Sequence, residues 1–218
     1  MKTLAALVLL SLGVANVDAG AYGIDSVDTI SSSTFSCLKN SGYSFYIGRV
    51  GQSNGGIDQG GLQNMRNAWA GGFSYVDAYI FPCVTCSTSA ATQVQNTINA
   101  LRNGGVQFGY LWLDVERYNW PSNQASNRQY ITDMANAGQN MGVTIGIYTN
   151  YYNWEEIVGL DYTNFRNYPL WYAHYDGVAN FSDFTPFGGW TKPSMKQYKG
   201  DVPGECSIGN IDVNWYPT

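Results

Sequence analysis

Charged side chains are scarce in this chain of 218 residues, because Asp, Glu, Lys and Arg together make up only 12% of it. The 16 acidic residues outnumber the 11 basic ones, and the formal net charge at pH 7 is −5. Proteins that bind nucleic acid through its phosphates carry a basic stripe that displaces counterions. This chain has too few basic residues for such a stripe, so we exclude nucleic acid as a partner.

A hydrophobic run long enough to cross a bilayer is also missing. The longest run lies near the amino terminus and covers about 13 residues, against roughly 20 for a membrane-spanning helix. It follows Lys2 and leads to the small-x-small stretch Val17-Asp18-Ala19, which is the layout of a secretory signal peptide. We therefore expect residues 1–19 to be a cleaved signal peptide rather than a membrane anchor. The protein would be secreted, or would reach the lumen of a digestive or phagolysosomal compartment.

Metal ligands are few, since the chain has one histidine, His174, and four cysteines. The Cys83/Cys86 spacing could indicate zinc, but zinc needs further Cys or His ligands. A redox pair would open a helix, whereas this one follows the apolar run YVDAYIF. In an oxidising compartment the cysteines predict two disulfides, and of three possible pairings we favour Cys83–Cys86 with Cys37–Cys206. We expect no metal and no cofactor.

Aromatic residues, by contrast, are abundant, with 17 Tyr and 7 Trp. Disordered chains are poor in aromatics, so this chain is expected to fold. Such a composition suits a ligand with hydroxyls and apolar faces, such as a sugar, but it also suits an ordinary core. Residues 20–218 fit one α/β domain, expected to be a monomer. The sequon Asn180-Phe181-Ser182 predicts N-glycosylation of Asn180.

The hydrophobic periodicity predicts eight strands, with helices between the first five of them. The predicted strands cover residues 21–27, 45–51, 75–81, 107–116, 144–150, 169–175, 194–200 and 210–216. Three segments have apolar residues at helical spacing: Leu62, Met65 and Trp69; Val94, Ile98 and Leu101; and Ile131, Met134 and Met141. The pairs Gly71-Gly72 and Gly104-Gly105 end the first two of these helices. Alternating strands and helices imply a parallel sheet with covering helices. The predicted fold class is therefore α/β: an irregular, flattened, TIM-like β/α barrel of five βα units followed by three strands.

Two carboxylates lie at the end of the fourth predicted strand, Asp114 and Glu116 in LWLDVE. Side chains two residues apart on a strand point the same way, and their Cα atoms lie roughly 6.5–7 Å apart. At that distance mutual repulsion pushes two pKa values apart. In parallel barrels the active site lies at the carboxyl ends of the strands, where these two acids sit.

Two further acids, Asp25 and Asp212, are isolated inside apolar runs in which an unpaired carboxylate is costly. If the first and last strands are neighbours, both acids reach the same barrel mouth. Each could instead cap a helix or pair with a base, and for Asp25 a helix beginning near Ser31 makes this alternative substantial. A cluster of acids without metal-ligating histidines suits acid–base catalysis on an acetal, which is glycoside hydrolysis.

Over nearly the whole mature chain these residues resemble the glycoside hydrolase family 25 lysozymes of the Chalaropsis type. The four matching motifs, in order, are G-x-D in YGIDSV, D-x-E in LWLDVE, W-x-A-x-Y in LWYAHY, and the closing aspartate in IDVNW. Each motif is weak alone, but four in order at matching intervals are specific. The cysteine pattern and YIFPCVTC look like the eukaryotic secreted branch of that family.

The resemblance implies N-acetylmuramidase activity on the β-1,4 link of bacterial peptidoglycan. It implies that Glu116 is the general acid, that Asp114 is its partner, and that Asp25 and Asp212 complete the groove floor. Aromatic side chains near the strand ends are candidates for sugar contacts, although a core role is the stronger expectation for each of them except Trp171, which the motif match favours as a contact. The candidates are Tyr79, Trp112, Tyr148, Trp171 and Tyr175, whereas His174 points the other way and is expected at the surface or behind the site.

Two other functions compete with this one. A chitinase-like barrel would carry D-x-x-D-x-D-x-E, but Trp112 and Tyr110 stand where its extra acids belong. A catalytically silent wall-binding protein would not need all of the acids present here. A hydrolase of this kind could retain the anomeric configuration in two ways, through a carboxylate nucleophile or through attack by the substrate's own acetamido group. Both routes are open, and we slightly favour the second. The acidic surface predicts best activity at mildly acidic pH.

Overall fold

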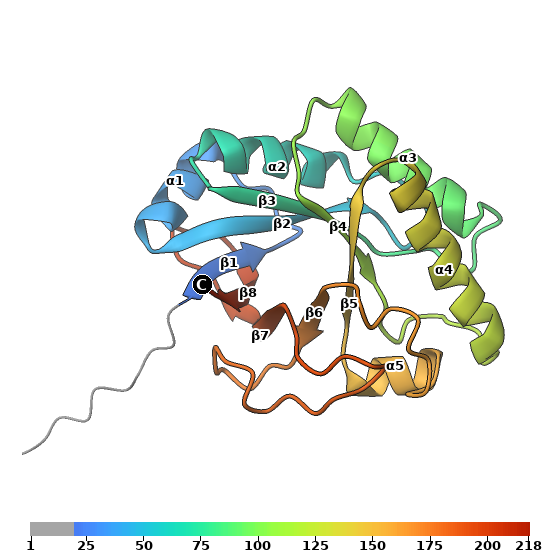
Figure 1. The fold of residues 1–218 in the computed structure, drawn as a ribbon. Coiled ribbons are helices and arrows are strands. Elements are labelled where there is room, and N and C mark those ends of the chain that lie inside the picture. Colours follow the sequence, from blue (N-terminus) through green and yellow to red (C-terminus); the bar gives the residue numbers. More distant parts are fainter. Residues whose placement is uncertain (1–19) are drawn as a thin grey trace, which may run out of the picture.

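A computed structural model describes residues 20–218 (Figure 1). The predicted signal peptide and its cleavage site lie outside these residues. The strands are β1 (Gly20–Asp25), β2 (Tyr43–Gly51), β3 (Tyr75–Ile80), β4 (Tyr110–Asp114), β5 (Thr144–Thr149), β6 (Leu170–Ala173), β7 (Met195–Pro203) and β8 (Asn210–Pro217). The helices are α1 (Ser32–Asn40), α2 (Gln59–Ala70), α3 (Ala90–Asn103), α4 (Gln124–Asn140) and α5 (Tyr151–Ile157).

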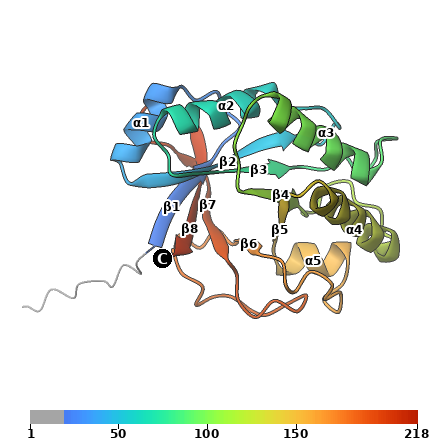
Figure 2. The same cartoon turned by 45° about the horizontal axis from the view of Figure 1, so that its top comes forward.

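The strands close into one barrel in chain order, β1 to β8. Neighbours from β1 to β7 are parallel, and β8 is antiparallel to both β7 and β1. The helices follow the first five strands and cover the outside of that half (Figures 1 and 2). Long irregular segments run beside β6 and β7 instead. The predicted β/α barrel of five βα units followed by three strands is confirmed.

Aromatic side chains fill the barrel interior, and glycines on neighbouring strands make room for them. Phe45, Trp112 and Trp171 belong to one buried cluster inside the barrel. Gly146 is the strand partner of Trp112, and a Cβ at Gly146 would lie 2.3 Å from that indole. Only glycine fits at such an approach, so the interior is a packed core rather than a pore.

The outer core lies between the strands and the covering helices. Val94, Ile98 and Leu101 of α3 are fully buried, as their spacing predicts. The stripes on α2 and α4 are shorter than predicted. Trp69 is 37% exposed, because its indole N–H donates to the Gln107 carbonyl at the surface. Met141 is only half-buried, because it is the C-cap residue beyond the last turn of α4.

Helix ends follow the local sequence. Ser31 caps α1, and its side chain accepts from the Thr34 N–H. Because Ser31 caps this helix, Asp25 does not have the helix-capping role that the sequence left open for it. Gly72 and Gly105 have positive φ of 86° and 64° just beyond α2 and α3, the left-handed conformation that ends a helix. Among residues 20–218, no helix combines the length and apolar character that crossing a bilayer requires.

Both favoured disulfides are present. Cys37 of α1 bonds to Cys206 in the β7–β8 connection, across a sequence separation of 169 residues. Cys83 bonds to Cys86, three residues away. The first bond ties the antiparallel end of the barrel to the first helix. Asn180 lies half-buried in the β6–β7 connection, and its side-chain oxygen accepts hydrogen bonds from the Ser182 N–H and hydroxyl.

The two disulfides should differ strongly in their effect on stability, because closing a longer loop restricts the unfolded chain more. We expect the Cys37→Ser/Cys206→Ser double variant to lose about 2–5 kcal/mol of unfolding free energy. The matched Cys83→Ser/Cys86→Ser variant should lose about 2 kcal/mol or less. Urea unfolding followed by tryptophan fluorescence measures both. A larger loss from the short-range pair would contradict this account.

Candidate active site

The four acids singled out from the sequence meet at one barrel mouth. Asp25 ends β1 and Asp114 ends β4, while Glu116 lies two residues further along. Asp25 and Asp212 are direct partners across the antiparallel β1–β8 pair. Charge repulsion acts between Asp114 and Glu116, between Asp114 and Asp25, and between Glu116 and Asp212. The closed barrel therefore brings together acids that lie up to 187 positions apart, from Asp25 to Asp212.

Asp25 and Asp212 form a pair that shares hydrogen-bond donors. One oxygen of Asp25 accepts from the Gln197 amide at 2.8 Å and from the Asn214 amide at 2.7 Å. The Gln197 amide also reaches Asp212 at 3.2 Å. Burial, followed by repulsion from Asp212, raises the pKa of Asp25 to about 8, against the lowering effect of the two amides. Asp25 therefore holds a proton at neutral pH and hydrogen-bonds to Asp212.

The backbone of β7 contributes to Asp212 directly. Asp201 adopts a left-handed conformation with φ 51°, uncommon outside glycine, and its N–H donates to Asp212 at 2.7 Å. The β7–β8 register is irregular on either side of Lys199, so β7 bends at this point. Burial raises the pKa of Asp212, and the Asp201 N–H acts in the opposite direction. The bend therefore supplies a donor that favours the charged form of Asp212.

Asp114 is the most isolated acid of the four. Its residue is 6% exposed, and its Oδ1 is buried without a hydrogen-bond partner among the described residues. Burial, then repulsion from Glu116 and Asp25, raises the pKa of Asp114 well above the usual range. A buried carboxylate oxygen without a donor is costly unless it carries a proton or receives a donor from a bound molecule.

Glu116 is the only one of the four acids that lines the pocket at this mouth. The pocket has a volume of about 410 Å³ and is bounded by Glu116, Arg117, Tyr118, Tyr148, Asn150, Asn153, Ala173, His174 and Tyr175. Glu116 is half-buried, and burial, then repulsion from Asp212, raises its pKa. Glu116 thus combines access to a ligand with retention of a proton above the usual pH range, which a general acid requires.

Gln197 connects the acids to two tyrosines, and sequence reasoning missed it. Its carbonyl accepts from Tyr148 at 2.7 Å and from Tyr175 at 2.9 Å, while its amide donates to Asp25 and Asp212. A glutamine in a strand is unremarkable in sequence. Its contact with the acids becomes apparent only when the pairing of β7 with β8 is known. The hydroxyls fix the orientation of the amide, which therefore points its N–H groups at the acids.

The five aromatic side chains expected to contact sugar are not equivalent. Tyr148 and Tyr175 line the pocket, and Tyr175 is 58% exposed. Trp112 and Trp171 are 3% and 2% exposed, and their indole N–H groups donate to Asp77 and Asn214. Tyr79 packs edge-on against Trp171. Trp112, Trp171 and Tyr79 thus belong to the barrel interior beneath the pocket, and do not line it.

His174 also lines the pocket, with its side chain half exposed. Together with Asp176 and Asp183 it forms a group whose spacing could hold a metal ion. The ammonium of Lys196 already bonds to both acids, at 2.7 and 2.6 Å. The Lys196 ammonium is therefore the cation that these acids bind, and we assign no metal to the cluster.

A family model described as "Lysozyme-like protein 1" matches residues 16–198. The chain is 46% identical to "Lysozyme-like protein 5" of Caenorhabditis elegans, covering 92% of this chain and 94% of that protein. It is 39% identical to "Probable GH family 25 lysozyme 2" of Dictyostelium discoideum, covering 97% and 98% of the two chains.

Solved structures agree on the fold. The structure of a family GH25 lysozyme from Aspergillus fumigatus superposes with a TM-score of 0.69 at 19% identity, covering 92% of this chain and 95% of that one. A muramidase from Acremonium alcalophilum superposes with a TM-score of 0.71 at 21% identity, covering 91% and 94%. At these identities the likeness concerns the fold alone.

The Asp25 carboxyl should make stability depend on pH. Its folded-state pKa of about 8 lies above its ordinary value of 3.8, so between these values the folded protein keeps a proton that the unfolded chain has released. The stability it contributes is complete below pH ~4 and is lost as pH rises toward ~8. Asparagine mimics the protonated carboxyl, so Asp25→Asn should flatten this decline and be more stable than wild type at pH 8.

Urea unfolding at pH 4, 6 and 8 measures this effect. Asp133→Asn, on α4 outside the barrel, is the matched control and should follow the wild-type curve. A constant difference between Asp25→Asn and wild type at every pH would show that Asp25 does not hold the extra proton.

Proposed function

The chain belongs to the glycoside hydrolase family 25 lysozymes, and on that premise we propose that it is an N-acetylmuramidase that cleaves the β-1,4 link of bacterial peptidoglycan. Family membership makes it a glycoside hydrolase that acts on peptidoglycan. The observation that carries the finer assignment is Glu116, the one acid of the cluster that both lines the pocket and has a raised pKa.

In the first step Glu116 donates its proton to the glycosidic oxygen as the bond from that oxygen to C1 of the muramic acid breaks. The carbonyl oxygen of the sugar's own 2-acetamido group bonds to C1 from the opposite face. In the second step the Glu116 carboxylate takes a proton from water, and the water oxygen attacks C1. The acetamido group is released, and the anomeric configuration is retained.

Asp114 is the partner in this mechanism. The acetamido N–H becomes acidic as its carbonyl attacks C1, and an acceptor beside it stabilises the positive charge. The unpartnered Oδ1 of Asp114 supports this role, because a substrate N–H would supply the donor that the protein does not. That donor favours ionised Asp114 in the complex, while Glu116 keeps its proton. Asp25 and Asp212 hold the floor of the groove beside them.

We propose a setting for the activity from the predicted signal peptide and the disulfides. A signal peptide at residues 1–19 would deliver the protein outside the cell or into a digestive or phagolysosomal lumen. Two disulfides suit such a compartment. There the enzyme would serve the digestion of bacteria or antibacterial defence.

The function is tested with purified peptidoglycan and the Glu116→Gln variant. Wild type should release new reducing ends that are muramic acid, with the retained anomer formed first. Glu116→Gln should be slower by roughly a hundredfold, the order expected when a general acid is lost. The matched control Glu155→Gln, an exposed acid on α5, should keep full activity.

Equal rates for wild type and Glu116→Gln would remove Glu116 from the mechanism. Binding to the wall without new reducing ends would favour a silent binding protein instead. An inverted product would contradict both the acetamido route and a carboxylate nucleophile.

The pH dependence of the activity should have its maximum at mildly acidic pH. The raised pKa of Glu116 keeps the acid protonated above the ordinary carboxyl range, and further increase in pH removes that proton. The net charge of −5 at pH 7 also repels the protein from an anionic wall. Initial rates at constant ionic strength from pH 3.5 to 8 measure this, and a maximum above pH 7.5 would contradict it.

A further inference from the structure

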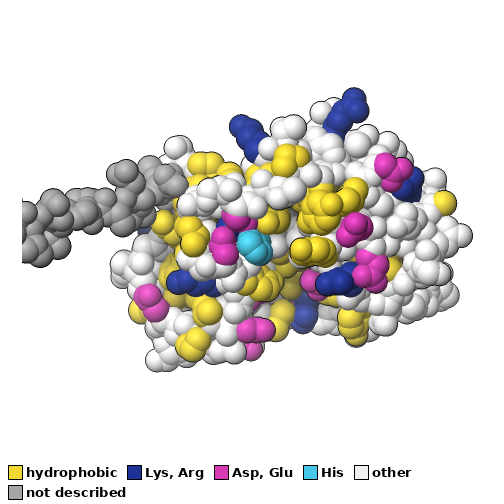
Figure 3. Space-filling model, turned by 90° about the horizontal axis from the view of Figure 1, so that it is seen from below, with side chains coloured by type: hydrophobic (Ala, Val, Ile, Leu, Met, Phe, Trp, Pro, Cys, Tyr) yellow, Lys and Arg dark blue, Asp and Glu magenta, His cyan; other side chains and the backbone are white. Residues whose placement is uncertain are grey.

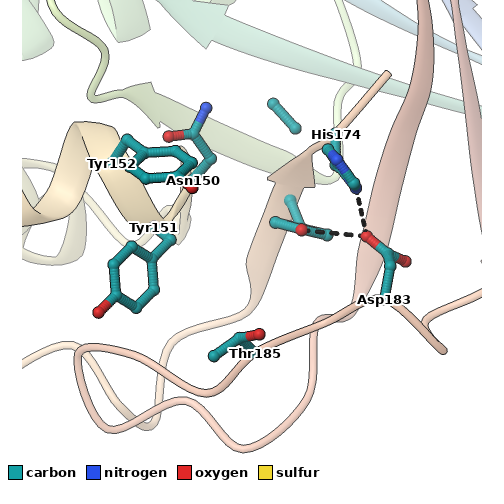
Figure 4. Close-up of a pocket in the computed structure, with 8 residues that line it drawn as sticks. Asn150, Tyr151, Tyr152, His174, Asp183 and Thr185 are labelled. Atoms are coloured by element: carbon teal, nitrogen blue, oxygen red, sulfur yellow. Dashed lines mark hydrogen bonds and ion pairs between the residues drawn. The ribbon is translucent and has the colours of Figure 1, made fainter. Parts of the chain in front are cut away.

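A second pocket opens beside the Glu116 pocket, between the start of α5 and the end of β6 (Figure 4). Its volume is about 440 Å³, within the roughly 300–1,000 Å³ that small-ligand sites occupy. It is lined by Asn150, Tyr151, Tyr152, Tyr172, Ala173, His174, Asp183 and Thr185. The proposed chemistry uses none of the residues that belong to this pocket alone.

The two pockets are neighbours that share part of their lining. Asn150, Ala173 and His174 line both of them. On this face of the molecule the single histidine lies among hydrophobic and acidic side chains (Figure 3). A polymer bound with its scissile link at Glu116 must extend beyond that pocket, and the second pocket lies directly beside it.

One wall of the second pocket is held rigidly by buried charges. The Lys196 side chain is fully buried, and its ammonium bonds to Asp183 at 2.6 Å and to Asp176 at 2.7 Å. Asp183 also accepts from the Tyr172 hydroxyl at 3.1 Å and bonds to the Nδ1 of His174. These bonds fix the β6–β7 connection against the barrel, so the wall is formed before any ligand arrives.

The facing wall is aromatic and exposed. Tyr152 is 67% exposed, and it meets Tyr151 edge-on with ring centroids 5.6 Å apart. Tyr151 in turn packs against Phe187 at 5.9 Å. Figure 4 shows the Tyr151 and Tyr152 rings across the pocket from the His174–Asp183 pair. An exposed tyrosine held in this way offers an apolar face and a hydroxyl to a ligand.

The charge of the lining argues for a neutral ligand. Asp183 is the only acid in the lining, and neither lysine nor arginine belongs to it. The buried Lys196 is neutralised by its two acids. Asp183 would repel the carboxylates of the peptide stems and the lactyl carboxylate that muramic acid carries once its stem is removed, whereas N-acetylglucosamine offers only hydroxyls and an acetamido group. Asn150, Thr185 and the tyrosine hydroxyls match those groups.

We propose that this pocket is a glycan subsite that binds an N-acetylhexosamine unit of the strand, next to the units cleaved at Glu116. The inference rests on the proposed function, because it takes the same polymer as ligand. The pocket increases affinity for long strands without taking part in bond cleavage, so its loss should raise KM and leave kcat nearly unchanged.

The test compares three variants on peptide-free glycan strands, prepared by removing the stems with an amidase. Tyr152→Ala should raise KM for long strands about tenfold, the order expected from loss of an aromatic contact, with little change in kcat. Tyr152→Phe retains the ring but loses the hydroxyl, so it should raise KM less than Tyr152→Ala does. Tyr75→Ala removes a tyrosine of similar exposure, 63%, at the opposite end of the barrel, and should have no effect.

Each outcome decides a separate question. Equal KM values for wild type and Tyr152→Ala on long strands would overturn the subsite. A KM increase seen only with intact peptidoglycan would also overturn it, because the pocket would then bind peptide stems. If wild type fails to release muramic acid reducing ends from any substrate, the proposed function fails instead. Thermal melting of each variant ensures that altered KM values come from folded protein.

Discussion

The mouth of the barrel brings four carboxyl groups together in a largely buried space with no compensating base. Among residues 20–218, none of Asp25, Asp114, Glu116 and Asp212 forms an ion pair with Lys, Arg or His. Burial is the largest cause of the raised pKa in all of them, and mutual repulsion contributes for Asp25, Asp114 and Glu116. The cluster therefore retains protons at pH values where isolated carboxyls are ionised. Neutral amide donors, rather than cations, hold the arrangement in place, so the proton is not displaced by a neighbouring positive charge.

The rest of the chain keeps these groups together. Antiparallel β8 is what sets Asp212 opposite Asp25, and the bend in β7 turns the Asp201 N–H toward Asp212. Beneath them, Trp171 donates to Asn214, which donates to Asp25, so the aromatic core is joined to the acids by hydrogen bonds. Side chains that support a site in this way restrict its geometry more than loops can. The Cys37–Cys206 bond fastens the same end of the barrel from outside.

Much of this could be predicted from the sequence, because it depends on local periodicity. Strand alternation predicted Asp114 and Glu116 on one face, although β4 ends at Asp114 and Glu116 lies two residues beyond it. Isolated acids in apolar runs identified Asp25 and Asp212. The roles of Gln197 and Lys196 could not be predicted, because both depend on contacts between segments distant in sequence. The sequence also did not show how deep Trp112 and Trp171, both expected to contact sugar, lie along the barrel axis. That depth is set by the stagger of neighbouring strands, which leaves both rings below the pocket.

The acid cluster holds a proton on Asp25 at neutral pH and has raised pKa values at its other three carboxyls, and carboxyl titration by ¹³C NMR tests this most directly. Spectra from pH 3 to 9 of wild type and of the Asp25→Asn, Asp114→Asn, Glu116→Gln and Asp212→Asn variants assign each resonance. The account predicts that Asp25 titrates near pH 8 and that the other three titrate above the ordinary carboxyl range. If all four carboxyls release their protons below about pH 5, as unperturbed carboxyls do, the buried cluster does not work as described.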